Sequence, residues 1–180
     1  MVNEILKLIL KGYERRPAPA MSWRLDALFR ALLDPAAAED PDDIQAMIWA
    51  LWCEHPDPEA ARSLSRAADA MVAGRLVVAE SMLDRTVLRW PDFAEAWNKR
   101  ATLYYMQDRD QESMSDIRTA LELEPRHFGA ICGFGQICMR RGDRMAALAA
   151  FETALRLNPH LANVRQMVEA LAEDLPRTVN

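Results

Sequence analysis

The chain has 180 residues, about half of them apolar, and only 6 glycines. Alanine and leucine dominate the apolar residues and β-branched residues are sparse, which favours an all-α fold over a sheet. The net charge of −5 argues against nucleic acid as the main partner, because phosphate binding requires a basic face. This length suffices for one domain with a real core or for a short array of repeats.

The chain begins with an amphipathic stretch, MVNEILKLILKGYERR, at residues 1–16. Its apolar part is too short for a signal peptide or a membrane span. The stripe can pack on the rest of the chain or on a partner, or it can dock on a membrane surface. The residues of this stripe are Val2, Ile5, Leu6, Ile9 and Tyr13. The segment RRPAPA, at 15–20, is typical of a short linker.

Two further helices are expected before residue 56. SWRLDALFRALL, from Ser22 to Leu33, indicates a helix with a serine N-cap. DPDDIQAMIWALWCEH, at 40–55, has Asp40 as N-cap and Pro41 in the first turn, followed by an apolar stripe. Neither segment fits the periodic pattern that follows.

A period of thirty-four residues governs the rest of the chain. VLRWP, ALELEP and ALRLNP end in Pro91, Pro125 and Pro159, each after an apolar helical run. Such a period indicates a repeat architecture, with blocks at 60–93, 94–127 and 128–161. Each block predicts two helices: the first ends near Gly74, Asp108 or Gly142, and the second is ended by its proline.

Small residues recur inside the blocks where two helices must approach closely. The eighth place of each block holds Ala67, Ala101 or Gly135, and the twentieth holds alanine or serine. Larger residues at the fourth and twenty-fourth places, such as Trp97 and Phe151, fill the space beside them.

The middle block, Trp97-x2-Arg100-Ala101-x2-Tyr104, then Ser113-x3-Ile117 and Pro125, resembles the tetratricopeptide repeat (TPR). The third block is similar to it again. The first block is the weakest match, with Ser63 where a large residue is usual, and Arg66 and Arg100 stand where an apolar residue is common. The resemblance implies a right-handed α-solenoid of antiparallel helix pairs.

The expected organisation has three parts. Residues 1–56 form an N-terminal helical extension that packs on the array, and its helices at 22–33 and 40–55 seal the N-terminal end. Residues 57–161 hold the three repeats, and residues 162–180 hold a capping helix and a frayed tail. The helix from about Leu161 to Asp174 presents Val164, Met167, Val168 and Leu171 to the last pair.

The resemblance also implies a binding groove on the concave side, lined by the first helix of each pair. Asn and Gln can bond a peptide backbone, Lys99 and Arg140 can hold a carboxylate, and Leu64 and Met71 can take an apolar side chain. The family's carboxylate clamp for chaperone tails is not reproduced. The alternatives are a solvated polar face and an apolar end covered by the chain's own N-terminal helices. The candidate groove residues are Leu64, Ala68, Met71, Asn98, Lys99, Thr102, Tyr105, Gln136, Met139 and Arg140.

No catalytic, metal or cofactor constellation emerges from the sequence. His55, His127 and His160 lie far apart at block boundaries, as surface or cap histidines do. The three cysteines lack metal-type spacing and indicate buried free thiols in a reducing compartment, so a cytoplasmic location is expected. The leading hypothesis is a non-enzymatic adaptor that binds a peptide or protein segment. The alternative is a membrane-peripheral assembly factor or co-chaperone anchored by residues 1–16, and an enzyme has no support.

Overall fold

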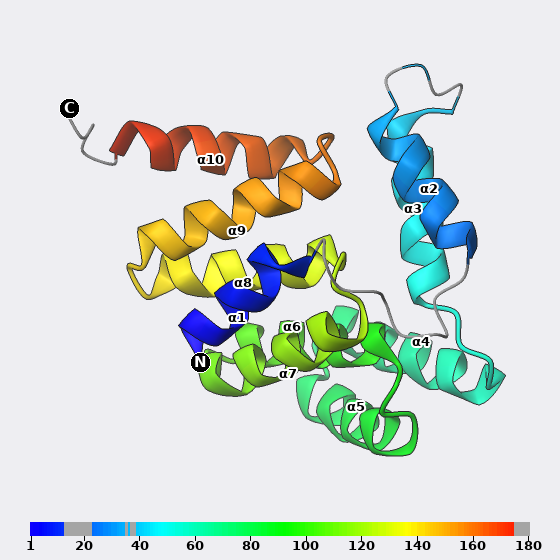
Figure 1. Cartoon of the computed structure of the whole chain (residues 1–180). Helices are drawn as coiled ribbons and strands as arrows, with labels where there is room; N and C mark the ends of the chain where they lie inside the picture. Colours follow the sequence, from blue (N-terminus) through cyan, green and yellow to red (C-terminus); the bar gives the residue numbers. More distant parts are fainter. Residues whose placement is uncertain (13–22, 35, 37–38, 175–180) are drawn as a thin grey trace.

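The computed structural model describes residues 1–12, 23–34, 36 and 39–174, and these form ten α-helices (Figure 1). The all-α solenoid expected from the sequence is confirmed, and no strand occurs in the described ranges. The helices are α1 (Val2–Leu10), α2 (Trp23–Leu33), α3 (Pro41–Trp52), α4 (Pro58–Val72), α5 (Leu76–Arg89), α6 (Ala94–Met106), α7 (Asp110–Leu123), α8 (Phe128–Arg140), α9 (Arg144–Leu157) and α10 (Ala162–Asp174).

The thirty-four-residue period reappears as three helix pairs, α4/α5, α6/α7 and α8/α9. The turn within each pair has one left-handed residue at the same place: Gly74 (φ 70°), Asp108 (φ 58°) and Gly142 (φ 77°). The next N–H in each turn bonds back to a carbonyl five residues earlier at 2.9 Å, which satisfies the end of the first helix. Each second helix ends two residues before its proline, because the residue preceding proline avoids the α conformation.

The small residues of each block are buried where the two helices of a pair cross. Ala67 and Ala101 are at most 2 % exposed, and Gly135 is buried. The Ser113 hydroxyl donates to the carbonyl of Ala101 at 2.8 Å, so even the polar residue at the twentieth place is satisfied inside the pair. Close approach of the helices therefore follows from the small side chains at these places.

Helix α10 covers the apolar side of α9 at the end of the array. Val164 and Leu171 are buried against it, and Met167 and Val168 are partly buried. The Leu161–Asp174 stripe expected to cap the last pair therefore faces the core. The predicted tail at 175–180 lies outside the described residues.

Helix α1 packs across the second helices of the last two pairs, α7 and α9 (Figure 1). Ile5 and Ile9 are 0 % and 1 % exposed, and Val2 and Leu6 pack beside them. The apolar stripe of α1 thus lies inside the fold, as the first of the two sequence alternatives requires. Tyr13 and the linker at 15–20 lie outside the described residues.

Helices α2 and α3 form a hairpin that packs on the loops before α8 and α10, and this corrects the expectation that they seal the first pair. Arg126 bonds Asp26 at 2.6 Å, Asn158 bonds Gln45 at 2.5 Å, and His160 contacts the carbonyl of Leu32 at 3.2 Å. The Asp40 cap is confirmed, since its carboxylate accepts from Asp42 N–H at 2.8 Å. The predicted Ser22 cap lies outside the described residues.

The physical reason for this placement is aromatic packing. Phe29 of α2 and Trp49 and Trp52 of α3 form one cluster with Phe128 of α8, with ring centroids 4.8–6.3 Å apart. The first pair offers no comparable set of rings on its outer face, which is lined by arginines.

The docking of α1 can be tested by a small change in its core. Replacing Ile9 with valine should lower the free energy of unfolding by about 1 kcal/mol, because one buried methylene is lost. Replacing the neighbouring Leu10, which is half exposed, with alanine should change it by less than about 0.5 kcal/mol. Urea denaturation checks both. If the apolar stripe of α1 faced lipid instead of the protein core, Ile9→Val would not lower the free energy of unfolding in solution.

Candidate binding site

A cavity of about 290 Å³ lies between α6 and α8, on the side of the array formed by the first helices. We call it the trough. Its lining residues are Asn98, Ala101, Thr102, Tyr105, Ser113, Ile117, Gly129, Cys132, Gly133 and Gln136. Four of the sequence-predicted groove residues, Asn98, Thr102, Tyr105 and Gln136, are thus brought together at one place.

The trough carries neutral polar groups above an apolar floor. The Tyr105 hydroxyl donates to the Gln136 side-chain oxygen at 3.4 Å, and the Thr102 hydroxyl donates to the carbonyl of Asn98 at 3.0 Å. Gly133 leaves room beside them, since an added Cβ there would meet only Ile117, at 3.6 Å. Ile117 and Ala101 are buried and supply the floor. The arrangement offers donors and acceptors without a free charge.

One end of this concave surface is closed by α3. A Cβ on Gly129 would lie 2.5 Å from the Trp49 ring, so α3 packs directly on the first turn of α8. Glu95, on the first turn of α6, is completely buried. The chain's own N-terminal hairpin therefore covers part of the groove, at the second and third pairs. The alternative given by the sequence is that the N-terminal helices cover the apolar end of the groove, at the first pair.

A buried polar cluster lies beneath this cover. His127 Nε2 and Glu95 Oε2 are 2.8 Å apart, and both side chains are inaccessible to solvent. His127 Nδ1 accepts from Ala130 N–H at 3.2 Å, so Nε2 carries the proton and donates to Glu95. The ring of Trp52 stacks on His127, with centroids 4.0 Å apart and planes within 11°. His127 is thus a cap residue, as expected, but a buried one.

Asn98 and Lys99 complete this cluster. The Asn98 amide donates to Glu95 Oε2 at 2.9 Å, and Lys99 Nζ lies 3.4 Å from Glu95 Oε1. Burial by itself would raise the pKa of Glu95, but the contacts with His127, Lys99 and Asn98 outweigh it and hold that pKa below its ordinary value of 4.5. Glu95 therefore stays ionised inside the fold. The pairing of Glu95 with His127, thirty-two residues away, is not among the sequence-based predictions, because it joins two different blocks of the period.

The remaining predicted groove residues lie outside the lining of the trough. Leu64 is 3 % exposed and belongs to the core of the first pair, while Ala68 and Met71 are half-buried on α4. Met139 and Arg140 are exposed at the end of α8. Because its side chain is buried, Leu64 is not accessible to an apolar side chain of a ligand.

The two cations expected to hold a carboxylate already have partners. Arg140 bonds Asp108 at 2.5 Å, Asp110, and the carbonyl of Tyr105 at 3.2 Å, and its guanidinium lies 4.1 Å from the Tyr105 ring centroid. Lys99 faces the buried Glu95. The positive charge at this site is neutralised from within the chain, which favours a ligand bound through neutral groups.

The thiols near the trough are poor nucleophiles. Burial raises the pKa of Cys132 to about 12, and burial together with the nearby Asp143 raises the pKa of Cys138 to about 12 as well. All three cysteines are free, but Cys53 is exposed, which corrects the expectation that the thiols are all buried. Across the part of the chain that the structure describes, no group of three or more His, Cys, Asp or Glu side chains could hold a metal ion. Within the same residues, no helix is long and apolar enough to cross a bilayer.

Comparisons with known proteins agree with this architecture. The tetratricopeptide repeat model matches residues 94–127, which are the middle block of the sequence period. A TPR repeat-containing protein of Rhizobium etli is 34% identical over 165 residues, covering 90% of this chain and 79% of that protein.

Solved structures share the fold at low sequence identity. The first TPR of Spaghetti (RPAP3), bound to an HSP90 peptide, superposes with a TM-score of 0.60 at 16% identity, covering 63% of this chain and 90% of that one. The Sgt2 TPR domain of Aspergillus fumigatus gives a TM-score of 0.60 at 18% identity, covering 66% and 80%. With its three helix pairs, its shared period and its Rhizobium relative, the chain belongs to the tetratricopeptide repeat family.

Proposed function

We propose that the chain is a non-enzymatic adaptor that binds an extended peptide or protein segment in the trough between α6 and α8. The observation that carries this proposal is the cavity of about 290 Å³ where Asn98, Thr102, Tyr105 and Gln136 converge. An adaptor role is also supported by the TPR fold, which in Spaghetti holds a peptide.

The chemistry of the lining favours a peptide backbone over a charged ligand. Gln136 offers an amide with both donors and an acceptor, and Tyr105 and Thr102 offer hydroxyls, which match the alternating N–H and C=O groups of an extended chain. Asn98 keeps its side-chain oxygen, since only its amide nitrogen is used by Glu95. The apolar floor at Ile117 and Ala101 can take a small apolar side chain of the bound segment.

Filling the trough should abolish this binding without unfolding the protein. Thr102 is exposed at the cavity, so Thr102→Trp places a large ring over it. Peptides selected from a random phage-displayed library on the immobilised full chain should lose at least about tenfold in affinity for this variant, measured by calorimetry.

Ser115→Trp is the matched control, because Ser115 is also a small exposed residue but lies on α7 outside the cavity lining. This variant should bind the selected peptides within about twofold of the wild type. Equal affinity of the Thr102→Trp and Ser115→Trp variants, both with unchanged melting temperatures, would refute the trough as the binding site.

A further inference from the structure

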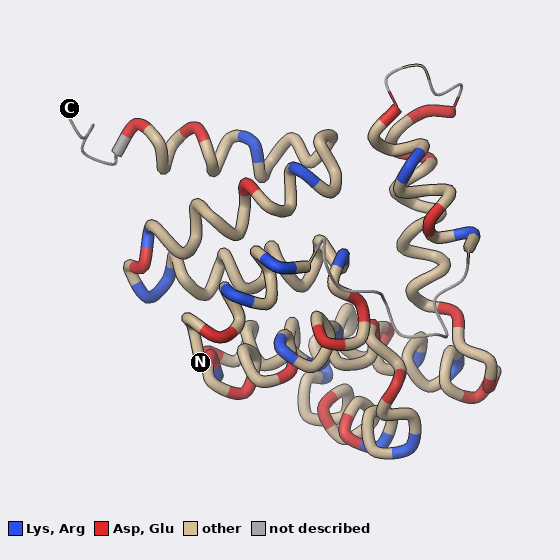
Figure 2. Tube along the Cα trace, viewed as in Figure 1, with Lys and Arg blue, Asp and Glu red and all other residues tan. Residues whose placement is uncertain are grey.

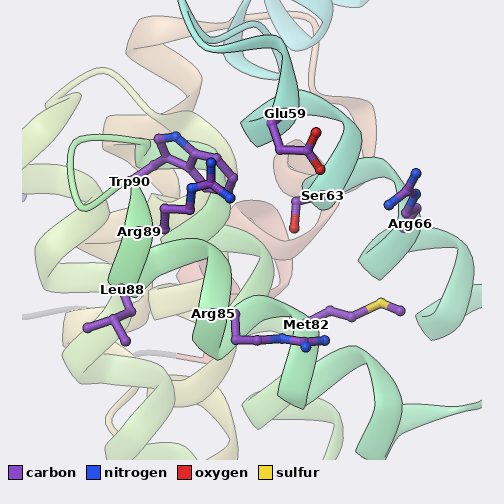
Figure 3. A pocket seen from close by; sticks show the side chains of 8 residues that line it. All are labelled: Glu59, Ser63, Arg66, Met82, Arg85, Leu88, Arg89 and Trp90. Atoms are coloured by element: carbon purple, nitrogen blue, oxygen red, sulfur yellow. The ribbon is translucent and has the colours of Figure 1, made fainter.

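The outer face of the first helix pair is hollow and basic. A cavity of about 500 Å³ opens between α4 and α5 (Figure 3). We call this surface the first-pair face. Its lining residues are Glu59, Ser63, Arg66, Met82, Arg85, Leu88, Arg89 and Trp90. It is where a preceding repeat would pack, and α1, α2 and α3 make the contacts described above elsewhere, at α7, α8 and α9.

Three guanidinium groups border this face without an ion pair to a carboxylate among the described residues, although the charge of Arg89 interacts with that of Asp57 at a longer distance. No ion pair there joins Arg66, Arg85 or Arg89 to an acid. Arg89 lies 4.6 Å from the Trp90 ring centroid, and Arg85 bonds only the carbonyl of Ser81 in its own helix. The acid in the lining, Glu59, pairs with Arg62 at 3.0 Å. The face is therefore positive although the chain as a whole is negative, and Figure 2 shows the basic positions on α4 and α5.

The contact between the first and second pairs shows which kind of element packs on the equivalent face of a repeat. Arg100, thirty-four residues after Arg66, bonds Asp84 of the preceding helix α5 at 2.9 Å. It also bonds Asp116 of its own pair through two contacts, at 2.7 and 2.9 Å. In the first pair, Met82 stands thirty-four residues before Asp116, so Arg66 lacks the carboxylate of its own pair as well.

We propose that the first-pair face binds an acidic amphipathic helix of a partner protein, in the position that α5 takes on the second pair. One carboxylate of that helix pairs with Arg66, as Asp84 pairs with Arg100, and a second, one turn away, pairs with Arg89 or Arg85. Apolar side chains between the acids fill the cavity beside Ser63 and Met82.

Two features favour a helix over a nucleic acid. Leu88 is 84 % exposed beside the cavity, and Met82 lines it, which gives the face an apolar component that phosphates do not use. The arginines form one small group in a chain of net charge −5, which repels a long polyanion.

A helix library tests this proposal on the full chain. A phage-displayed single-helix library, with Asp, Glu, Asn, Gln, Leu and Ala allowed on one face, is selected on the wild type. The enriched peptides should carry carboxylates at positions i and i+3 or i+4, flanking apolar residues. Their affinity should fall at least about tenfold for the double variant Arg66→Gln with Arg89→Gln, and for the same peptide with its Glu changed to Gln.

The control variant removes two exposed arginines away from this face, with Arg118→Gln on α7 and Arg165→Gln on α10. It should bind within about twofold of the wild type, which separates a local effect from a change in net charge. Both double variants should melt at the wild-type temperature. Thr102→Trp should leave helix binding unchanged, so this inference and the trough proposal fail independently.

Three outcomes would overturn the proposal. The first is a selection that enriches peptides with Asn and Gln in place of Asp and Glu, or selected peptides that bind both double variants with equal affinity. The second is a wild-type dimer, seen by light scattering, that the Arg66→Gln with Arg89→Gln variant converts to a monomer, because the occupant is then a second copy of this chain. The third is a DNA duplex that binds with the same dependence on Arg66 and Arg89.

Discussion

Replacing Gly135 with leucine should lower the free energy of unfolding by about 3 kcal/mol or more, which is the cost of overpacking a tight core. An added Cβ at Gly135 would lie 2.5 Å from the Phe151 ring, and three ring atoms lie within 2.8 Å of that position. Phe151 is 0 % exposed and Gly135 is buried, so the ring has no solvent to move into. Helices α8 and α9 must separate, and this weakens the pair on which α1 and α10 also pack. Urea denaturation followed by circular dichroism measures the loss.

Gly133 provides the matched control in the same helix. An added Cβ there meets only Ile117, at an ordinary distance of 3.6 Å. Gly133→Ala should therefore raise the free energy of unfolding by about 0.5–1 kcal/mol, because alanine loses less conformational freedom than glycine in a helix. Gly135→Ala should instead be destabilising. Equal effects of the two alanine substitutions would show that the pair is not packed as described.

Replacing Glu95 with alanine should destabilise the fold by about 3–5 kcal/mol, since removing one partner of a buried pair leaves the others uncompensated. His127 and Asn98 donate hydrogen bonds to this one carboxylate, and Lys99 forms an ion pair with it. Lys99 would keep its charge at a largely buried place, and His127 would lose the acceptor of its Nε2 proton. Trp52 and Trp49 pack on the His127 ring, so the α2/α3 hairpin should loosen too. Trp fluorescence during denaturation reports on both events.

Glu122→Ala is the control for this change. Glu122 is on the exposed side of α7 and lies 3.7 Å from Arg118, with both side chains nearly half exposed. Solvent and salt screen such a pair, and its removal should cost less than about 0.5 kcal/mol. A Glu95→Ala variant as stable as Glu122→Ala would contradict the buried cluster.

The buried Glu95 carboxylate should also make the stability of the protein fall at acidic pH. The folded pKa of Glu95 lies below 4.5, its ordinary value, because its contacts with His127, Lys99 and Asn98 outweigh the effect of burial. Its contribution is therefore fully present above pH 4.5 and disappears as the pH falls through the folded pKa. The stability difference between the wild type and Glu95→Gln should shrink over that range. A difference that stays constant down to acid unfolding would show that Glu95 is not held ionised.

Much of the fold could be predicted because its signals are local. Pro91, Pro125 and Pro159 end helices through their own missing N–H and the constraint on the residue before them. The first helices end at turns in which one residue, Gly74, Asp108 or Gly142, adopts the left-handed backbone conformation. The site was predictable only in part. The resemblance to the tetratricopeptide repeat implied Asn98, Thr102, Tyr105 and Gln136 as groove residues, but it did not imply the pairing of Arg140 with Asp108 and Asp110.

The sequence by itself determined the helices, their thirty-four-residue period and the small residues where they cross, because each depends on neighbours within one or two turns. Only the tertiary structure decided where the N-terminal helices dock and which groove residues stay open. Those outcomes depend on contacts such as Phe29 with Phe128, Asp26 with Arg126 and Glu95 with His127. Such contacts join residues far apart in the chain, and they leave no periodic pattern in the sequence.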